Sequence, residues 1–164
     1  MTINDLYRKR RAPRINFPED YVVLDLETTG LSPASDEIID IAAVRYISGA
    51  KVSEFSTLVK PSIPIPQEIT DITGITDDMV ADAPDINEAL DGLSMFLNPD
   101  DLVVGHNVGF DVRFLAAAYS RIGEEFAPEV FDTCGVSRIL YPELPKHRLI
   151  DLMKAFGIRE SQSH

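Results

Sequence analysis

The chain has 164 residues, of which 45% are hydrophobic and 26% charged. These values are close to the globular average and sufficient for one domain of about 150 residues, so they exclude a disordered tail or a collagen-like repeat. No stretch approaches the roughly 18 apolar residues of a membrane span, and residues 1–14 lack a secretory signal. A single cysteine, Cys134, excludes an internal disulfide and fits a reducing compartment. We therefore expect a cytoplasmic protein with no membrane partner.

The charge is strongly acidic and unevenly distributed. Fifteen Lys and Arg oppose 27 Asp and Glu, which gives a net charge of −12, the wrong sign for gripping nucleic acid by overall attraction. Five of the basic residues lie within residues 8–14. We interpret residues 1–19 as a basic arm, either a contact for a polyanion or a solvated tail, and residues 20–164 as one domain. Carboxylates that hold divalent cations would reverse the charge locally.

Apolar runs and turn residues predict the elements of the first half. Residues 21–26 form a short β-branched run typical of a buried strand. Two further strands are expected over 37–47 and 52–59, joined by a hairpin at 48–51. Pro61, Pro64 and Pro66 predict a loop, and Asp77-Asp78 marks the start of a short helix.

The second half alternates helices and strands. Apolar residues at spacings of three and four predict helices over 84–97 and 108–122, with a buried strand at 101–105 between them. A last strand is expected at 130–133, followed by helices near 133–140 and 147–156. A hairpin followed by such alternation predicts an α/β domain with a mixed five-stranded sheet flanked by helices.

Two carboxylates end the first predicted strand. Asp25 and Glu27 are two residues apart, so both side chains lie on one face of that strand. Neighbouring carboxylates repel unless one is protonated or a cation lies between them, and a hard ion such as Mg²⁺ or Mn²⁺ suits oxygen ligands. The structural alternative is a solvated acidic pair.

A second polar cluster lies where the strand at 101–105 gives way to a helix. It contains His106, Asn107 and Asp111, and Asp111 falls in the first helical turn, where the helix dipole favours a carboxylate. Ordinary structural roles, a helix-start acid and a satisfied histidine, are the alternatives. Two acidic clusters that both follow apolar strands of one domain predict a shared site.

These two motifs carry a resemblance to a known family. The segments 25–30 (DLETTG) and 106–111 (HNVGFD) resemble the first two motifs of the DEDD 3′–5′ exonucleases, His branch, and are similar to the proofreading exonuclease of bacterial DNA polymerase III. Thr73-Gly74-Ile75-Thr76 and Phe131-Asp132-Thr133 also match the family pattern. The resemblance runs from about residue 20 to the end of the chain.

The resemblance implies a ribonuclease H-like fold and metal-dependent removal of nucleotides from the 3′ end of single-stranded DNA, with an RNA end as an alternative substrate. Two ions, Mg²⁺ or Mn²⁺, would be held by Asp25, Glu27 and Asp111. A DNA polymerase subunit is an expected partner. The residues expected to contact the terminal nucleotides are Thr28, Thr29, Gly30, Leu31, His106, Asn107 and Phe110.

The family also has a His-x4-Asp pair in its last motif. His164 lies where that histidine belongs and would act as the catalytic base. The Asp expected five positions later, in the family's C-terminal helix, is outside the given sequence, so low activity is expected of the chain as given. The rival assignment pairs His147 with Asp151, at a shorter spacing.

Two other classes compete with the nuclease hypothesis. Haloacid dehalogenase-type phosphatases begin with a strand and D-x-D-x-T, to which residues 25–29 are similar, and Asp25 would then be a nucleophile. The cluster at 106–111 has no role in that scheme. A binding module for nucleic acid or a polymerase, of the same fold but weakened in catalysis, is the non-enzymatic alternative.

Overall fold

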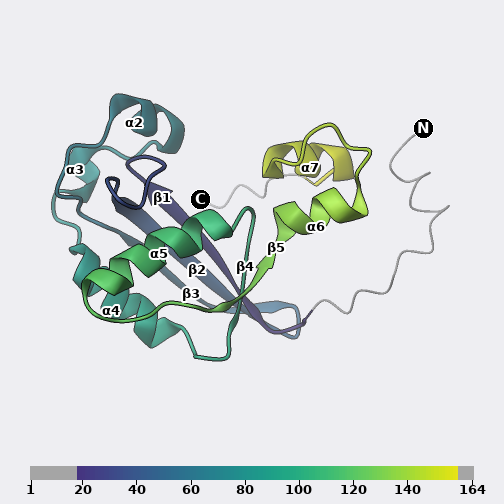
Figure 1. Cartoon of the computed structure of the whole chain (residues 1–164), viewed down its shortest axis with the longest axis horizontal. Helices are drawn as coiled ribbons and strands as arrows, with labels where there is room; N and C mark the ends of the chain where they lie inside the picture. Colours follow the sequence, from purple (N-terminus) through teal and green to yellow (C-terminus); the bar gives the residue numbers. More distant parts are fainter. Residues whose placement is uncertain (1–17, 159–164) are drawn as a thin grey trace.

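The computed structural model describes residues 18–158, which form a mixed five-stranded sheet (Figure 1). The strand order is β3-β2-β1-β4-β5, with β1, β2 and β3 antiparallel and β1, β4 and β5 parallel. The strands are β1 Tyr21–Thr28, β2 Ile38–Ile47, β3 Ala50–Leu58, β4 Leu102–Gly105 and β5 Glu129–Asp132. The first strand in sequence is thus the central strand of the sheet.

The helices lie in three groups around this sheet, as Figure 1 shows. α4 and α5 cross one face, α2 and α3 form a small cap at one end, and α6 and α7 form a separate lobe beyond β5. We call residues 133–156 the α6–α7 lobe. The helices are α2 Gln67–Thr73, α3 Asp77–Val80, α4 Ile86–Phe96, α5 Gly109–Arg121, α6 Thr133–Leu140 and α7 Leu149–Phe156.

The main core lies between the sheet and helices α4 and α5. Alternate residues of β1, at positions 22, 24 and 26, point into it and meet the apolar stripes of the two helices. In α4 the stripe is Ala89, Leu90 and Leu93, which are spaced as one face of a helix requires. Asp85 and Glu88 form a capping box that fixes where this helix begins. Burial of this face orients β1 so that its odd-numbered residues face away from the core.

The predicted sheet and its flanking helices are confirmed, with element ends within two residues of the sequence-based limits. The prediction missed α2, which lies in the segment interpreted as a proline-rich loop. This helix has seven residues, begins after Pro66 and buries none of its side chains. It therefore has no apolar stripe from which its period could be recognised.

No helix of the described residues is long and apolar enough to cross a membrane. The basic cluster at 8–14, in the predicted arm of residues 1–19, lies outside the part of the chain that the structure describes.

Replacement of Leu93 by Ala tests the packing of α4 on the sheet. Leu93 is fully buried, so Leu93→Ala should lower the free energy of unfolding by about 2–5 kcal/mol through lost transfer energy and a residual cavity. Met95, two residues along, is 89% exposed, and Met95→Ala should change stability by less than about 0.5 kcal/mol. Urea denaturation measures both. Equal effects of the two substitutions would contradict this packing.

Candidate active site

Asp25 and Glu27 lie on the face of β1 that points away from the main core. The burial pattern alternates along the strand, with Leu24 and Leu26 buried and Asp25 exposed between them. The antiparallel register places Asp40 of β2 directly opposite Glu27. Directly opposite residues of an antiparallel pair share a face, so three carboxylates meet at the end of the central strand.

A sharp chain reversal after β4 carries Asp111 to the same place. Gly105 ends β4 so close to its neighbours that an added Cβ would lie 3.0 Å from the Leu24 carbonyl oxygen. Asn107 then adopts a left-handed conformation with φ 65°, which asparagine tolerates better than most residues. α5 starts at Gly109, so that Asp111 stands in its first turn.

Asp111 is tied directly to the backbone between Asp25 and Glu27. The Leu26 amide donates a hydrogen bond to Asp111 Oδ1 at 3.0 Å, and Asp111 is 5% exposed. This amide is available because β4 pairs with β1 only at Val22 and Val23. The structure therefore brings together the three acidic residues that the sequence predicted to meet.

The burial of these carboxylates and their closeness raise their pKa values. Burial raises the pKa of Asp111 to about 7, and the charges of Asp25 and Glu27 contribute to this rise. The pKa of Glu27 is also raised, mainly by burial and then by Asp25 and Asp40. Lost hydration against the sheet raises the pKa of Asp25, although its side chain still reaches solvent. Repulsion of this kind is relieved when a cation binds.

The side chains fit a divalent cation that keeps part of its hydration. Among residues 18–158, no group of three or more His, Cys, Asp or Glu is arranged to hold a metal ion by itself. Mg²⁺ is usually bound by one or two carboxylates together with water and substrate phosphate oxygens, rather than by a closed protein cage. The acidic, oxygen-only donor set at Asp25, Glu27 and Asp111 suits that type of site.

The turn after β1 is built from the residues predicted to contact a terminal nucleotide. The Thr28 hydroxyl donates to the Gly30 carbonyl at 2.6 Å, and the Thr29 hydroxyl accepts from the Glu37 amide at 2.9 Å. A Cβ on Gly30 would lie 2.4 Å from a carboxylate oxygen of Asp36, so the turn has no room for a side chain there. Leu31 is 82% exposed, which leaves its side chain free to contact a ligand.

The residues of the second motif have different surroundings. His106 uses both ring nitrogens, with Nδ1 3.0 Å from Thr133 Oγ1 and Nε2 2.7 Å from the His147 carbonyl oxygen. Asn107 is exposed, and its backbone N–H donates a hydrogen bond to Asp132 Oδ1, so its side-chain amide is not used in this bond. Phe110 is half-buried, and the centroid of its ring lies 4.9 Å from the ring centroid of Phe114. His106 thus supports the structure around the site, whereas Asn107 is open to a ligand.

The predicted base and its rival are placed differently. His164 lies outside the described residues, so its role stays a prediction. His147 Nδ1 is 2.9 Å from Ser137 Oγ, and Asp151 forms an ion pair with Arg148 that lowers the pKa of Asp151. No hydrogen bond or ion pair of residues 18–158 joins His147 or Asp151 to Asp25, Glu27 or Asp111, and the rival assignment stays a prediction as well.

Sequence reasoning missed Asp40 and the basic residues near α6 and α7. Asp40 lies inside an apolar strand pattern, and only the antiparallel register with β1, which is regular up to the Glu27–Asp40 pair, puts it beside the cluster. The signal for the basic residues was present, since Arg138, Lys146 and Arg148 fall in one short stretch of an otherwise acidic chain. Their meeting in space depends on the loop between the two helices.

A ribonuclease H-like mixed sheet, with carboxylates at the end of its central strand and at the start of the next helix, defines the class as a metal-assisted nuclease. The exonuclease family model RNase_T matches residues 22–164, so the chain belongs to this exonuclease family. The resemblance to DEDD 3′–5′ exonucleases is confirmed, and the phosphatase alternative is wrong.

A curated relative shows the same relationship. The PolC-type DNA polymerase III of Bacillus subtilis (strain 168) is 41% identical over 155 residues, which are 93% of this chain and 11% of that polymerase. The chain thus spans about a tenth of the length of the curated relatives that it matches.

Solved structures agree in fold. Exonuclease X in complex with 5′ overhanging duplex DNA is 31% identical with a TM-score of 0.70, and the match covers 88% of this chain and 76% of that one. The zinc-bound form of an E. coli exonuclease I–ssDNA complex is 26% identical with a TM-score of 0.75, covering 90% and 37%. Exonucleases of this family use divalent metal ions.

Asp111→Asn tests the electrostatics of the site. The folded protein keeps a proton on Asp111 that the unfolded chain has already released, so wild-type stability should fall as pH rises from 3.8 to about 7. Asparagine can still accept the Leu26 hydrogen bond but carries no charge. In EDTA at pH 8, the variant should be more stable by up to about 4 kcal/mol.

Urea denaturation between pH 4 and 8 measures this effect. Asp91→Asn, which makes the same charge change at an exposed position of α4, should follow the wild-type pH dependence. A variant Asp111→Asn with an unaltered pH profile would show that Asp111 is not held in a repulsive cluster.

Proposed function

We propose that the chain removes nucleotides one at a time from the 3′ end of single-stranded DNA, as a proofreading or repair exonuclease. The single observation that carries the proposal is the placement of Asp111 against β1 between Asp25 and Glu27. Membership of the exonuclease family and the DNA complexes of related exonucleases support the substrate.

Asp25, Glu27 and Asp111 are the residues that would hold the metal, as Mg²⁺ or Mn²⁺ and as two ions in the complete site. The chemistry that a metal held there would supply is activation of the attacking water and stabilisation of the departing 3′ oxygen. The protein's own contribution is to place three carboxylates close together, with Asp111 buried and Asp25 open to solvent and substrate. Without a metal these carboxylates repel one another, and this repulsion favours the binding of a cation between them.

The turn after β1 would receive the terminal nucleotide. Thr28 and Thr29 hold the turn in shape through their own hydrogen bonds, and Gly30 leaves room for the Asp36 carboxylate against the turn. The exposed side chain of Leu31 would pack against the terminal base. Asn107 and Phe110 would contact the next nucleotide, while His106 supports that segment. Such contacts to sugar, phosphate and base face carry little sequence preference.

His164 would accept the proton of the attacking water, as the family pattern implies. A DNA polymerase is the partner that the relatives suggest, because the matched region is a small part of a PolC-type polymerase. In that setting the chain would remove misincorporated nucleotides from the growing strand. DNA is the proposed substrate, and RNA is the alternative to be compared with it.

Asp25→Asn should reduce 3′-end cleavage more than about 100-fold. Asp25 would be a metal ligand, and even the outer-shell partners of metal ligands cost 10–100-fold when they are replaced. The measurement uses a 5′-labelled single-stranded oligonucleotide with Mn²⁺ or Mg²⁺, and the products are resolved as a ladder that shortens from the 3′ end. Blocking that end should abolish cleavage, and an RNA strand run in parallel compares the substrates.

Asp91→Asn serves as the matched control, since it removes the same charge at an exposed position of α4. It should retain wild-type activity. Undiminished cleavage by the Asp25→Asn variant would refute the proposed site. Binding of the strand without cleavage, unaffected by this substitution, would instead favour the binding-module alternative.

A further inference from the structure

A cavity of about 730 Å³ with cationic walls lies between the end of β4 and the α6–α7 lobe. Its polar lining consists of Arg138, Lys146, Arg148, His106, His147 and Asn107. No Asp or Glu of the described chain lines this cavity. It is therefore a positively charged hollow in a protein whose net charge is −12.

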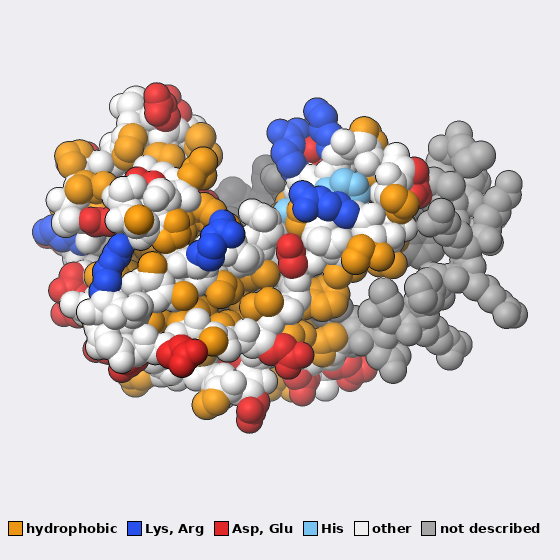
Figure 2. Space-filling model, viewed as in Figure 1, with side chains coloured by type: hydrophobic (Ala, Val, Ile, Leu, Met, Phe, Trp, Pro, Cys, Tyr) orange, Lys and Arg blue, Asp and Glu red, His pale blue; other side chains and the backbone are white. Residues whose placement is uncertain are grey.

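The charge of the surrounding segment differs from that of the rest of the molecule. Residues 138–154 contain four Lys and Arg and two Asp and Glu, whereas the other described residues contain five and 23. Figure 2 shows Lys and Arg side chains grouped around a histidine on the α6–α7 lobe. A local reversal of sign on this scale attracts anions to one side of the molecule.

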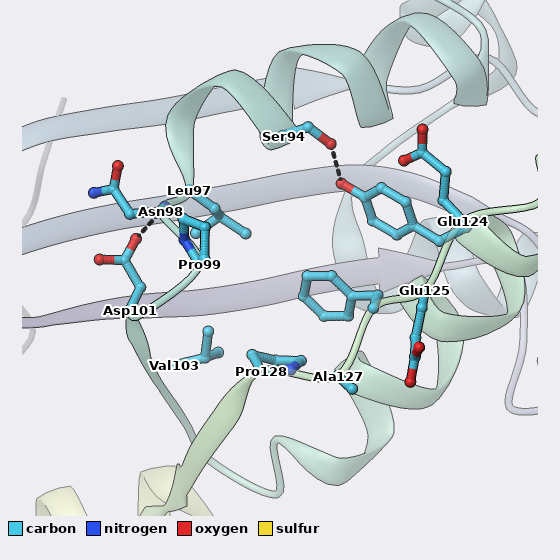
Figure 3. Close-up of a pocket in the computed structure, with 12 residues that line it drawn as sticks. Ser94, Leu97, Asn98, Pro99, Asp101, Val103, Glu124, Glu125, Ala127 and Pro128 are labelled. Atoms are coloured by element: carbon cyan, nitrogen blue, oxygen red, sulfur yellow. Dashed lines mark hydrogen bonds between the residues drawn. The ribbon is translucent and has the colours of Figure 1, made fainter.

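A second cavity provides an internal comparison. The pocket of Figure 3, about 500 Å³ in volume, has Asp101, Glu124 and Glu125 in its wall, beside the hydrogen-bonded pair Ser94–Tyr119. No Lys or Arg of the described chain lines it. The two hollows are thus of opposite charge, and only the one beside the α6–α7 lobe is suited to a phosphate group.

Two of the three cations are available to a ligand. Arg148 is paired with Asp151 through Nε at 2.6 Å. Arg138 and Lys146 belong to no ion pair among residues 18–158, and both are exposed, while Lys146 lies near enough to Asp151 to help lower the pKa of that carboxyl. An arginine and a lysine that line one hollow without a carboxylate can both contact phosphate oxygens.

The wall of the cavity is held in place by hydrogen bonds. His106 Nε2 lies 2.7 Å from the His147 carbonyl oxygen, and the other ring nitrogen of His106 meets Thr133. His147 Nδ1 lies 2.9 Å from Ser137 Oγ in α6. The same His106-Asn107 segment leads directly into α5, where Asp111 lies one helical turn beyond Asn107. The hollow is therefore preformed and continuous in sequence with the carboxylate cluster.

We propose that Arg138 and Lys146 bind backbone phosphates of the single strand, upstream of the nucleotide that is removed. This inference rests on the proposed function, which supplies the strand and places its 3′ end at the carboxylate cluster. The phosphate of a released mononucleotide has related chemistry, and the experiment separates the two sources.

The double variant Arg138→Gln/Lys146→Gln tests the inference in EDTA, where strand binding is measured without hydrolysis. Fluorescence anisotropy gives the Kd of the full chain for a labelled 12-nucleotide single strand over a range of salt concentrations. Each phosphate contact contributes about 0.7 to the slope of log K against log salt for single strands. Loss of two contacts should reduce the slope by about 1.4 and weaken binding roughly 10- to 30-fold at 0.1 M salt.

Lys51→Gln/Lys60→Gln is the matched control, with two cations removed from β3 and the segment that follows it. Both residues are exposed, and the Lys51–Glu54 pair is a surface ion pair of small energetic value. This variant has the same net charge as the test variant and should bind the strand within twofold of wild type. An equal loss in both variants would mean that only overall charge matters, and would overturn the inference.

Thymidine 5′-monophosphate separates the two phosphate sources. If the mononucleotide binds wild type and loses affinity in the test variant while strand binding is unchanged, the cavity is a product site and the strand assignment is wrong. If the wild-type protein degrades the strand but the Arg138→Gln/Lys146→Gln variant binds the strand as tightly as wild type, this inference alone is overturned. Wild-type protein that binds with the expected slope change yet never cleaves in Mn²⁺ overturns the proposed function, and of the inference it leaves only the binding of strand phosphates by Arg138 and Lys146.

Discussion

The hydrogen bond from the Leu26 amide to Asp111 is the constraint on which the site depends. It forms because β4 leaves β1 after two paired residues, so that a side chain from α5 takes the position a neighbouring strand would occupy. A buried backbone amide without a partner would cost about 1–3 kcal/mol. Satisfying it with a carboxylate places negative charge beside Asp25 and Glu27. The hydrogen bond that satisfies the backbone therefore holds Asp111 where the neighbouring carboxylates repel it.

That opposition gives the cluster its chemistry. The backbone bond favours a charged Asp111, whereas burial and the charges of the two strand residues disfavour it and prevail, because the pKa of Asp111 rises to about 7. Near neutral pH the cluster is therefore ready to exchange a proton for a metal ion. Strain of this type is common where function requires it, and the rest of the fold compensates through the dense core under α4 and α5.

The sequence predicts most of the fold because its elements carry clear periodicity. Leu90 and Leu93 mark α4, and the alternation of Leu24, Asp25 and Leu26 marks both the strand and the face its acids occupy. The convergence of Asp111 on this strand followed from two motifs that each end an apolar strand. Asp40 could not be predicted, because its position opposite Glu27 depends on the register between β1 and β2, which neither strand's own sequence pattern gives.

The basic cavity shows why net charge is a poor guide to the partner of this protein. With 27 acidic residues the chain repels a polyanion over most of its surface. Among residues 18–158, attraction is expected at two places, the carboxylate cluster once cations bind and the hollow beside the α6–α7 lobe. Since His106-Asn107 joins both, a strand held in the hollow as proposed would be led toward Asp111. Repulsion over the rest of the described surface would then favour a ligand that reaches both places at once.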